Sequence, residues 1–282
     1  HDHHNIVPAA QCFRKYGMNL EKLDGLKIYI LESLHSGDRK TGEDLKDYLR
    51  QIWYEQNISN SDCQYYRISN QDELYIQLKN IESEVLTDNK WPIVQFECHG
   101  SSVGIHLSSN EQVKWEELFN HLRPINIASK NFLLLTLSMC NGECVIRYID
   151  PKQRAPFRAV VGPVGKAFPD DLVNSWNTFY TKFIESLTQD YGLHKLAQKS
   201  GLIYYNQDFI FDVHFDLVNK DPELFTIFRN KEMYEMYKAE GVLEMSPEIY
   251  RLWVAKEQAK IKEKYRNIFC FDDLKSLCKD NQ

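Results

Sequence analysis

Two reactive side chains, His99 and Cys140, each follow an apolar run, and each stands close to a glycine. The first run reads IVQFEC before His99 and Gly100, and the second reads FLLLTLSM before Cys140 and Gly142. A thiol becomes a strong nucleophile as a thiolate, and a neighbouring imidazole commonly takes its proton. The pair therefore predicts nucleophilic catalysis, provided that the fold brings the two runs together.

The segments around this pair alternate between strand and helix patterns. Short β-branched or apolar runs predict strands at 26–33, 63–68, 91–98, 131–139, 157–165 and 210–218, with a hairpin arm at 102–107. Apolar residues at helical spacing predict helices at 43–56, 71–86, 113–122, 172–187 and 194–200. Such alternation is typical of a mostly parallel α/β sheet with helices on both faces.

The carboxyl ends of parallel strands meet at one edge of the sheet, where ligands bind. If 91–98 and 131–139 are neighbours, His99 and Cys140 lie about 5–10 Å apart. Acyl transfer also requires N–H donors for the developing oxyanion. We expect these donors to be the backbone N–H groups of Gly100 and Cys140.

Composition and charge exclude several function classes. A net charge of −6 without a basic patch argues against a nucleic-acid ligand. Apolar runs stay well short of the roughly 20 residues that a membrane helix requires, so we expect a cytoplasmic protein. Seven scattered cysteines are typical of reduced, mostly buried thiols. Cys140 and Cys144 lack a second ligand pair at zinc spacing, so we expect neither a metal nor another cofactor.

The segments CHGSSVGIHL, KWEELFNHL and LLLTLSMCNG resemble the caspase-like cysteine peptidases, and most closely their CHAT branch. The resemblance covers about residues 26–218. It implies a three-layer αβα sandwich around a mostly parallel six-stranded sheet. It also implies a cysteine endopeptidase in which Cys140 is the nucleophile and His99 the general acid and base. Met139, where the family commonly has Ala, and Cys98, where it has Gly or Ser, depart from the pattern.

The resemblance sets the expected domain organisation and partners. Residues 1–25 form an N-terminal extension, 26–218 the peptidase domain, and 219–282 a helical extension that caps the sheet or docks a regulatory protein. Several bacterial CHAT proteins act in antiphage defence by cleaving a partner such as a gasdermin, which implies a bacterial source and a protein substrate. The alternative is a catalytically silent interaction module, although retention of both His99 and Cys140 favours an enzyme.

Four residues are candidates for the substrate pocket: Glu32, Asp38, Arg39 and Ser138. Ser138 stands two residues before Cys140, where some relatives have an Asp that selects a basic P1 side chain. An inward Glu32 or Asp38 predicts a basic P1 residue, an inward Arg39 predicts an acidic one, and outward charges predict a neutral one. The resemblance favours a neutral or basic P1 residue.

Overall fold

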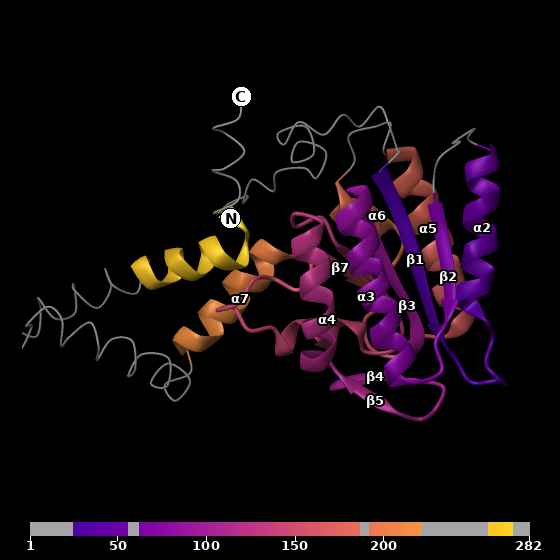
Figure 1. The fold of residues 1–282 in the computed structure, drawn as a ribbon, viewed down its shortest axis with the longest axis horizontal. Coiled ribbons are helices and arrows are strands. Elements are labelled where there is room, and N and C mark those ends of the chain that lie inside the picture. Colours follow the sequence, from indigo (N-terminus) through magenta and orange to yellow (C-terminus); the bar gives the residue numbers. More distant parts are fainter. Residues whose placement is uncertain (1–24, 56–61, 187–191, 221–258, 273–282) are drawn as a thin grey trace, which may run out of the picture. The chain divides into compact units, whose positions relative to one another are not determined.

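The computed structural model describes residues 25–55, 62–186, 192–220 and 259–272 (Figure 1). In chain order the strands are β1 (Leu26–Ser33), β2 (Asp62–Arg67), β3 (Trp91–Gly100), β4 (Gly104–His106), β5 (Gln112–Lys114), β6 (Leu134–Ser138), β7 (Ala159–Gly162) and β8 (Ile203–Asn206). The helices are α2 (Thr41–Glu55), α3 (Gln71–Asp88), α4 (Trp115–Ala128), the 3-10 helix η2 (Gly142–Tyr148), α5 (Pro169–Ser186), α6 (Leu193–Lys199) and α7 (Gln207–Lys220).

Six strands form the main sheet in the order β2-β1-β3-β6-β7-β8. Every pairing along this order is parallel except the last, in which β8 runs antiparallel to β7. The short strands β4 and β5 form a hairpin that extends the carboxyl end of β3. The predicted α/β fold with a mostly parallel, six-stranded sheet is confirmed.

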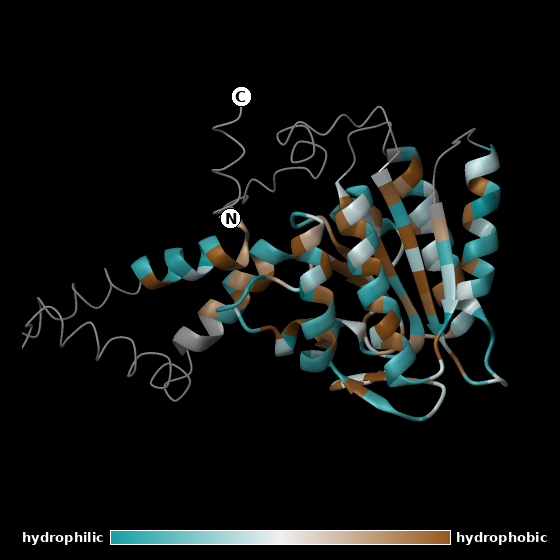
Figure 2. Cartoon of the chain, viewed as in Figure 1, coloured by the Kyte–Doolittle hydropathy of each residue, from teal (hydrophilic) through white to brown (hydrophobic). Residues whose placement is uncertain are grey.

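Helices cover both faces of the sheet because both faces of its strands are apolar. On one face, α2 and α5 pack on residues such as Ile28, Ile30 and Ile93. On the other face, α3 and α4 pack together, and Lys27 of β1 pairs with Glu84 of α3. Figure 2 shows hydrophobic colour along the strands and hydrophilic colour on the outer sides of the helices. Helices therefore cover both faces of the sheet, and a functional site is expected at an end of its strands.

The predicted start of α3 is confirmed by its cap. The side-chain oxygen of Asn70 accepts a hydrogen bond from the backbone N–H of Glu73 at 2.9 Å. Such a cap satisfies one of the unpaired N–H groups at a helix start and contributes about 1 kcal/mol. The next residues buried on this helix, Leu74, Leu78 and Ile81, follow the predicted apolar stripe.

The strand predicted at 210–218 is wrong. This segment belongs to α7, and the sixth strand of the sheet is β8, which precedes it. The buried residues Gln207, Ile210, Phe211 and Phe215 follow the i, i+3, i+4, i+8 spacing of one helical face. The prediction followed an apparent alternation in this stretch and overlooked the four-residue run IYYN.

Two boundaries near the functional edge also differ from the prediction. The strand predicted at 91–98 continues through Gly100, because His99 and Gly100 pair with the hairpin strand β4. The helix predicted from 113 begins at Trp115, because Gln112–Lys114 forms the second hairpin strand. Hairpin pairing therefore fixes the backbone on both sides of the His-Gly step.

Contacts divide the chain into two compact units. The first unit contains the sheet and both helical layers, up to Ile149 and again over Pro156–Asn206. The second contains Asp150–Ala155 and the chain from Gln207 onward. Within it, the Ala155 N–H donates to the Phe269 carbonyl at 3.2 Å. Residues 259–269 are helical.

The predicted extensions lie mostly outside the described residues. Of the segment 1–25 the structure describes Gly25, and of 219–282 it describes 219–220 and 259–272. The predicted domain boundaries therefore stay predictions. Across the described part of the chain, the model has no helix that combines the length and the apolar character needed to span a membrane.

Candidate active site

His99 and Cys140 extend two neighbouring strands at the carboxyl edge of the sheet. The last residues paired between β3 and β6 are Glu97 and Ser138. His99 still belongs to β3, whereas Cys140 lies in the turn two residues beyond the end of β6. Side chains of a strand alternate between faces, so His99 follows Glu97 on the same face of the sheet. The two neighbouring strands therefore bring both residues to the same edge of the sheet.

The face in question is the one covered by α2 and α5. The Thr41 hydroxyl, at the start of α2, donates to Glu97 at 2.7 Å. The Tyr180 hydroxyl, on α5, donates to Gln95 at 2.9 Å. His99 continues this row of side chains beyond the ends of both helices, where its side chain is 51% exposed.

A carboxylate from the β1–α2 loop holds the imidazole of His99. His99 Nε2 lies 2.9 Å from Asp38 Oδ2, and the ring of His35 stacks on the His99 ring with centroids 5.5 Å apart. The His35 backbone N–H also donates to Asp38 Oδ2 at 2.9 Å. Burial raises the pKa of Asp38, but the hydrogen bonds from His99 and His35, with the charges of both imidazoles, bring it below its usual value.

The thiol of Cys140 lies against the segment that leads into α5. The Ala167 N–H points to Cys140 Sγ at 3.4 Å, and the Ala167 carbonyl oxygen lies 3.6 Å from the same sulfur. The thiol is partly exposed, so an electrophile can reach it.

The turn that follows Cys140 is fixed by the loop between β7 and α5. Asn141 adopts a left-handed conformation with φ of 57°, and its N–H donates to the Gly165 carbonyl at 2.7 Å. The Glu143 carboxylate in turn accepts the Gly165 N–H at 3.1 Å. These bonds hold the nucleophile loop and the segment around Ala167 as one rigid piece.

Gly100 fills a position that only glycine fits. A Cβ at this residue would lie 2.3 Å from the Cys140 carbonyl oxygen and 2.7 Å from Met139 Cγ. The Ser101 N–H bonds to Gly104, and paired residues of an antiparallel ladder are hydrogen-bonded alternately. The Gly100 N–H is therefore directed away from β4 and toward the side of β3 on which β6 lies. Its predicted role as an oxyanion donor stays a prediction.

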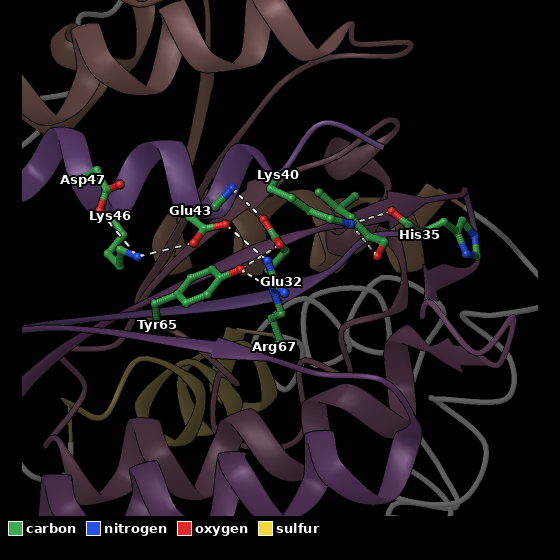
Figure 3. A network of polar contacts seen from close by, with 10 residues as sticks. Glu32, His35, Lys40, Glu43, Lys46, Asp47, Tyr65 and Arg67 are labelled. Carbon is green, nitrogen blue, oxygen red and sulfur yellow. Dashed lines mark hydrogen bonds and ion pairs between the residues drawn. The ribbon is translucent and has the colours of Figure 1, made fainter. Parts of the chain in front are cut away.

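Glu32, predicted as a pocket residue, lies inside the protein. It is 2% exposed, and its carboxylate accepts hydrogen bonds from the Tyr65 hydroxyl at 2.7 Å and the Gly42 N–H at 2.9 Å. Figure 3 shows these bonds and the ion pair between Arg67 and Glu43 that continues the network. Glu32 thus anchors the start of α2 to the sheet.

The other predicted pocket residues do not gather around one cavity either. Asp38 is bound to His99, while Arg39 pairs with Asp44 at 2.9 Å and with Asp170 at the start of α5. Ser138 is 3% exposed and stands in register with the buried Glu97, so it belongs to the interior of the sheet. The three charged candidates therefore all have partners within the protein.

The sequence analysis missed Glu97, which lies directly beneath His99 on the same face. Glu97 is 1% exposed, stands in register with Glu32, and accepts hydrogen bonds from Thr41 and from Gln95 Nε2 at 2.7 Å. Burial raises the pKa of Glu97 to about 7, against the effect of its hydrogen bonds and with a contribution from Glu32. The available signal was an acidic residue within an otherwise buried strand.

No metal-binding arrangement accompanies these acids. Across the described residues, no group of three or more His, Cys, Asp or Glu side chains is placed to hold a metal ion. The arrangement at the sheet edge is a thiol, an imidazole and a carboxylate, flanked by backbone N–H groups. These groups are suited to nucleophilic attack on a carbonyl carbon followed by proton transfer.

Comparisons with known proteins give a likeness of fold. No family model and no curated protein matches the chain. The Drosophila initiator caspase Dronc is similar, with 14% identity, a TM-score of 0.46, and coverage of 64% of this chain and 79% of Dronc. Raptor of Chaetomium thermophilum is similar at 9% identity, with a TM-score of 0.33 and coverage of 63% of this chain and 20% of Raptor. We transfer no residue roles from either protein.

Proposed function

We propose that this protein is a cysteine endopeptidase with Cys140 as nucleophile and His99 as general acid and base. One observation carries the proposal. The strands β3 and β6, which lead to His99 and Cys140, are parallel neighbours paired as far as Glu97 and Ser138, so both residues leave the sheet at the same edge. A partly exposed thiol and an exposed imidazole contribute little to packing of the core, so packing alone does not account for these two residues.

The reaction follows from the contacts of each group. His99 takes the proton of the Cys140 thiol, and the resulting thiolate attacks the carbonyl carbon of the scissile peptide bond. The negative charge that develops on the carbonyl oxygen is stabilised by the N–H groups of Gly100 and Cys140. His99 then protonates the leaving amine, and water hydrolyses the acyl-enzyme with His99 as base.

The proposed substrate is a protein, cleaved at a specific site. Exposed apolar side chains near the edge, Val103 at 41%, Val164 at 61% and Phe168 at 56%, support binding of an extended peptide. A gasdermin-like or other defence effector as substrate, and a regulator bound through the C-terminal helices, extend this proposal from the family resemblance. A cytoplasmic location belongs to the same extension.

Active-site labelling tests the peptidase directly. The full chain is treated with peptidyl electrophiles that differ in the residue offered to the P1 pocket, and the modified cysteine is identified by mass spectrometry. We expect labelling at Cys140 that depends on His99, because the thiolate is the reacting species. The His99→Ala variant should label at least about tenfold more slowly at neutral pH.

Cys98 provides a matched control within the same strand end. It adjoins His99 in sequence but is 4% exposed, and burial raises the pKa of its thiol. We expect Cys98 to remain unmodified while Cys140 reacts. Equal labelling of both cysteines, or a Cys140 rate that does not depend on His99, would leave the catalytically silent interaction module as the better explanation.

A further inference from the structure

The β1–α2 loop, residues 34–40, places two groups against the imidazole of His99. Asp38 binds the ring at Nε2, and the ring of His35 stacks on it. The same Asp38 oxygen accepts the backbone N–H of His35, so the loop itself fixes the carboxylate. The start of α2, held by the buried Glu32 and Glu97, fixes the far end of this loop.

A carboxylate accepts hydrogen bonds and a neutral imidazole has one donor nitrogen. A contact of 2.9 Å between Nε2 and Asp38 therefore requires the ring proton on Nε2. The other tautomer would set a lone pair of Nε2 against the carboxylate oxygen. With Nε2 committed, Nδ1 is the nitrogen that remains available as a base.

We propose that Asp38 is a positioning residue, which keeps the proton of neutral His99 on Nε2 and makes Nδ1 the atom that exchanges a proton with Cys140. Asp38 also stabilises the imidazolium that forms when His99 takes the thiol proton. This inference rests on the proposed peptidase function. It gives Asp38 a role toward His99 in place of the substrate-pocket role predicted from the sequence.

Several other titratable or charged groups surround His99. Glu97 lies on the same strand as His99, and His35 and Lys40 lie on the β1–α2 loop. His106 of β4 pairs with His99, and Cys140 follows the end of β6. Lys40 is bound to the carbonyls of Leu34 and His35, and His106 lies 3.4 Å from Gln112. Unlike these groups, Asp38 is hydrogen-bonded to the His99 ring, so its removal should change the orientation and the tautomer of the ring most.

Kinetics separates a positioning role from a pocket role. Two fluorogenic peptides, one with Leu and one with Arg at P1, are compared in wild type, Asp38→Asn and Asp44→Asn. Asp44→Asn removes the same charge and the Arg39 contact but lies outside the His99 contact. We expect Asp38→Asn to lower kcat about 10- to 1,000-fold for both peptides with KM changed less than about threefold, and Asp44→Asn to stay within about threefold.

The pH profile gives a second signature. Asp38→Asn should lower kcat/KM for both peptides across the whole pH range, whereas Asp44→Asn should follow the wild-type profile. A selective loss of the Arg peptide with an unchanged profile would overturn the inference in favour of a pocket role. Full activity of Asp38→Asn on both peptides would overturn it as well.

A measurement of the tautomer does not depend on activity. Nitrogen-15 NMR of histidine-labelled Cys140→Ala protein, with the His99 signals assigned by comparison with His99→Ala, reports which nitrogen carries the proton. We expect Nε2–H with Asp38 and a mixture of tautomers in Asp38→Asn. A tautomer that depends on Asp38 supports the inference even if the labelling experiment fails, whereas an unchanged tautomer overturns it even in an active peptidase.

Discussion

The two faces of the sheet differ sharply at its carboxyl edge. On the face of α2 and α5, the last strand residues are polar and buried, and they lead directly to the reactive pair. These buried polar residues are Glu32, Gln95, Glu97, Thr136 and Ser138. On the face of α3 and α4, the corresponding residues are mostly apolar, and all are at most 4% exposed. They are Tyr29, Leu31, Phe96, Cys98, Leu137 and Met139, together with Ser33, whose hydroxyl donates to the Ile68 carbonyl at 2.6 Å.

The difference shows where the protein accepts an energetic cost. Burying a carboxylate is unfavourable unless hydrogen bonds and a shifted pKa compensate, and both compensations are present at Glu97. The opposite face also holds a buried charge, Lys27, which is paired with Glu84, but at the carboxyl edge its mostly apolar side chains gain from burial directly. A polar interior on one face is therefore the physical sign of the functional side.

The largest effect should come from exchanging equivalent thiols on the two faces. Cys140→Ala should abolish cleavage of a peptide substrate, by at least about 10³-fold in kcat/KM, because no other group can form the acyl-enzyme. Cys98→Ala removes a buried sulfur on the opposite face and should keep activity within about fivefold. Cleavage rates and thermal unfolding of both variants provide the measurement.

The reverse pattern would remove the functional distinction between the faces. Activity retained in Cys140→Ala and lost in Cys98→Ala, with both proteins folded, would contradict the assignment of the nucleophile. His99→Ala belongs to the same experiment. It should reduce cleavage nearly as strongly, with residual activity at high pH where some thiolate forms without a base.

Gly100→Ala should have the next largest effect. Its Cβ would lie 2.3 Å from the Cys140 carbonyl oxygen, so the nucleophile loop must move. We expect a loss of about 1–3 kcal/mol in the free energy of unfolding and a fall in kcat of at least about tenfold. Gly37→Ala, in the exposed β1–α2 loop where the added methyl meets nothing within 4 Å, is the control for denaturant unfolding and kinetics.

Glu97→Gln tests the polar interior itself. The pKa of Glu97 is raised to about 7 in the folded protein, so the folded state binds more protons than the unfolded chain between about pH 4.5 and 7. Wild-type stability should therefore fall as the pH rises through this window and level off above it. The variant stays neutral and should lack this fall, which leaves it on the order of 2–3 kcal/mol more stable than wild type at pH 8.

Denaturant unfolding from pH 4.5 to 8 measures this dependence, with Glu116→Gln as an exposed control that removes the same charge. The control should follow the wild-type curve. A Glu97→Gln curve parallel to wild type over the whole range would mean that Glu97 is ionised throughout, and that the two faces do not differ in this respect.

Much of the architecture could be predicted from local patterns. Apolar runs predicted β1, β3 and β6, and apolar residues at helical spacing predicted the start of α3, because these elements bury one clear stripe or run of residues. The helix α7 was misread because a few apolar positions fit two periods, and tertiary packing decided between them. The hairpin arm predicted at 102–107 contains β4, but β5 was missed because a three-residue strand carries almost no pattern.

The reactive pair, His99 and Cys140, could be predicted from the sequence because each residue follows an apolar strand pattern. Asp38 was visible as an acid near the site, but its contact with His99 depends on the loop conformation, which sequence spacing does not determine. The same holds for Arg39, whose partner Asp170 lies 131 residues away. Contacts between loops of distant segments are set by the sheet order, and the sequence alone leaves that order open.

The smallest expected effect concerns the three charged residues that were predicted for the substrate pocket. Arg39, Asp38 and Glu32 are each bound to other groups of the protein, so none presents an uncompensated charge to a P1 side chain. We therefore expect a peptide library varied at P1 to show preference for neutral residues. Exposed ion pairs such as those of Arg39 contribute about 0–1 kcal/mol, so Arg39→Ala should change kcat/KM on a neutral peptide less than about fivefold. The contrary outcome is cleavage confined to sites after Asp that is lost in Arg39→Ala and kept in Lys46→Ala. It would show that Arg39 binds an acidic P1 residue, because the substrate carboxylate would then displace Asp44 and Asp170 from the guanidinium.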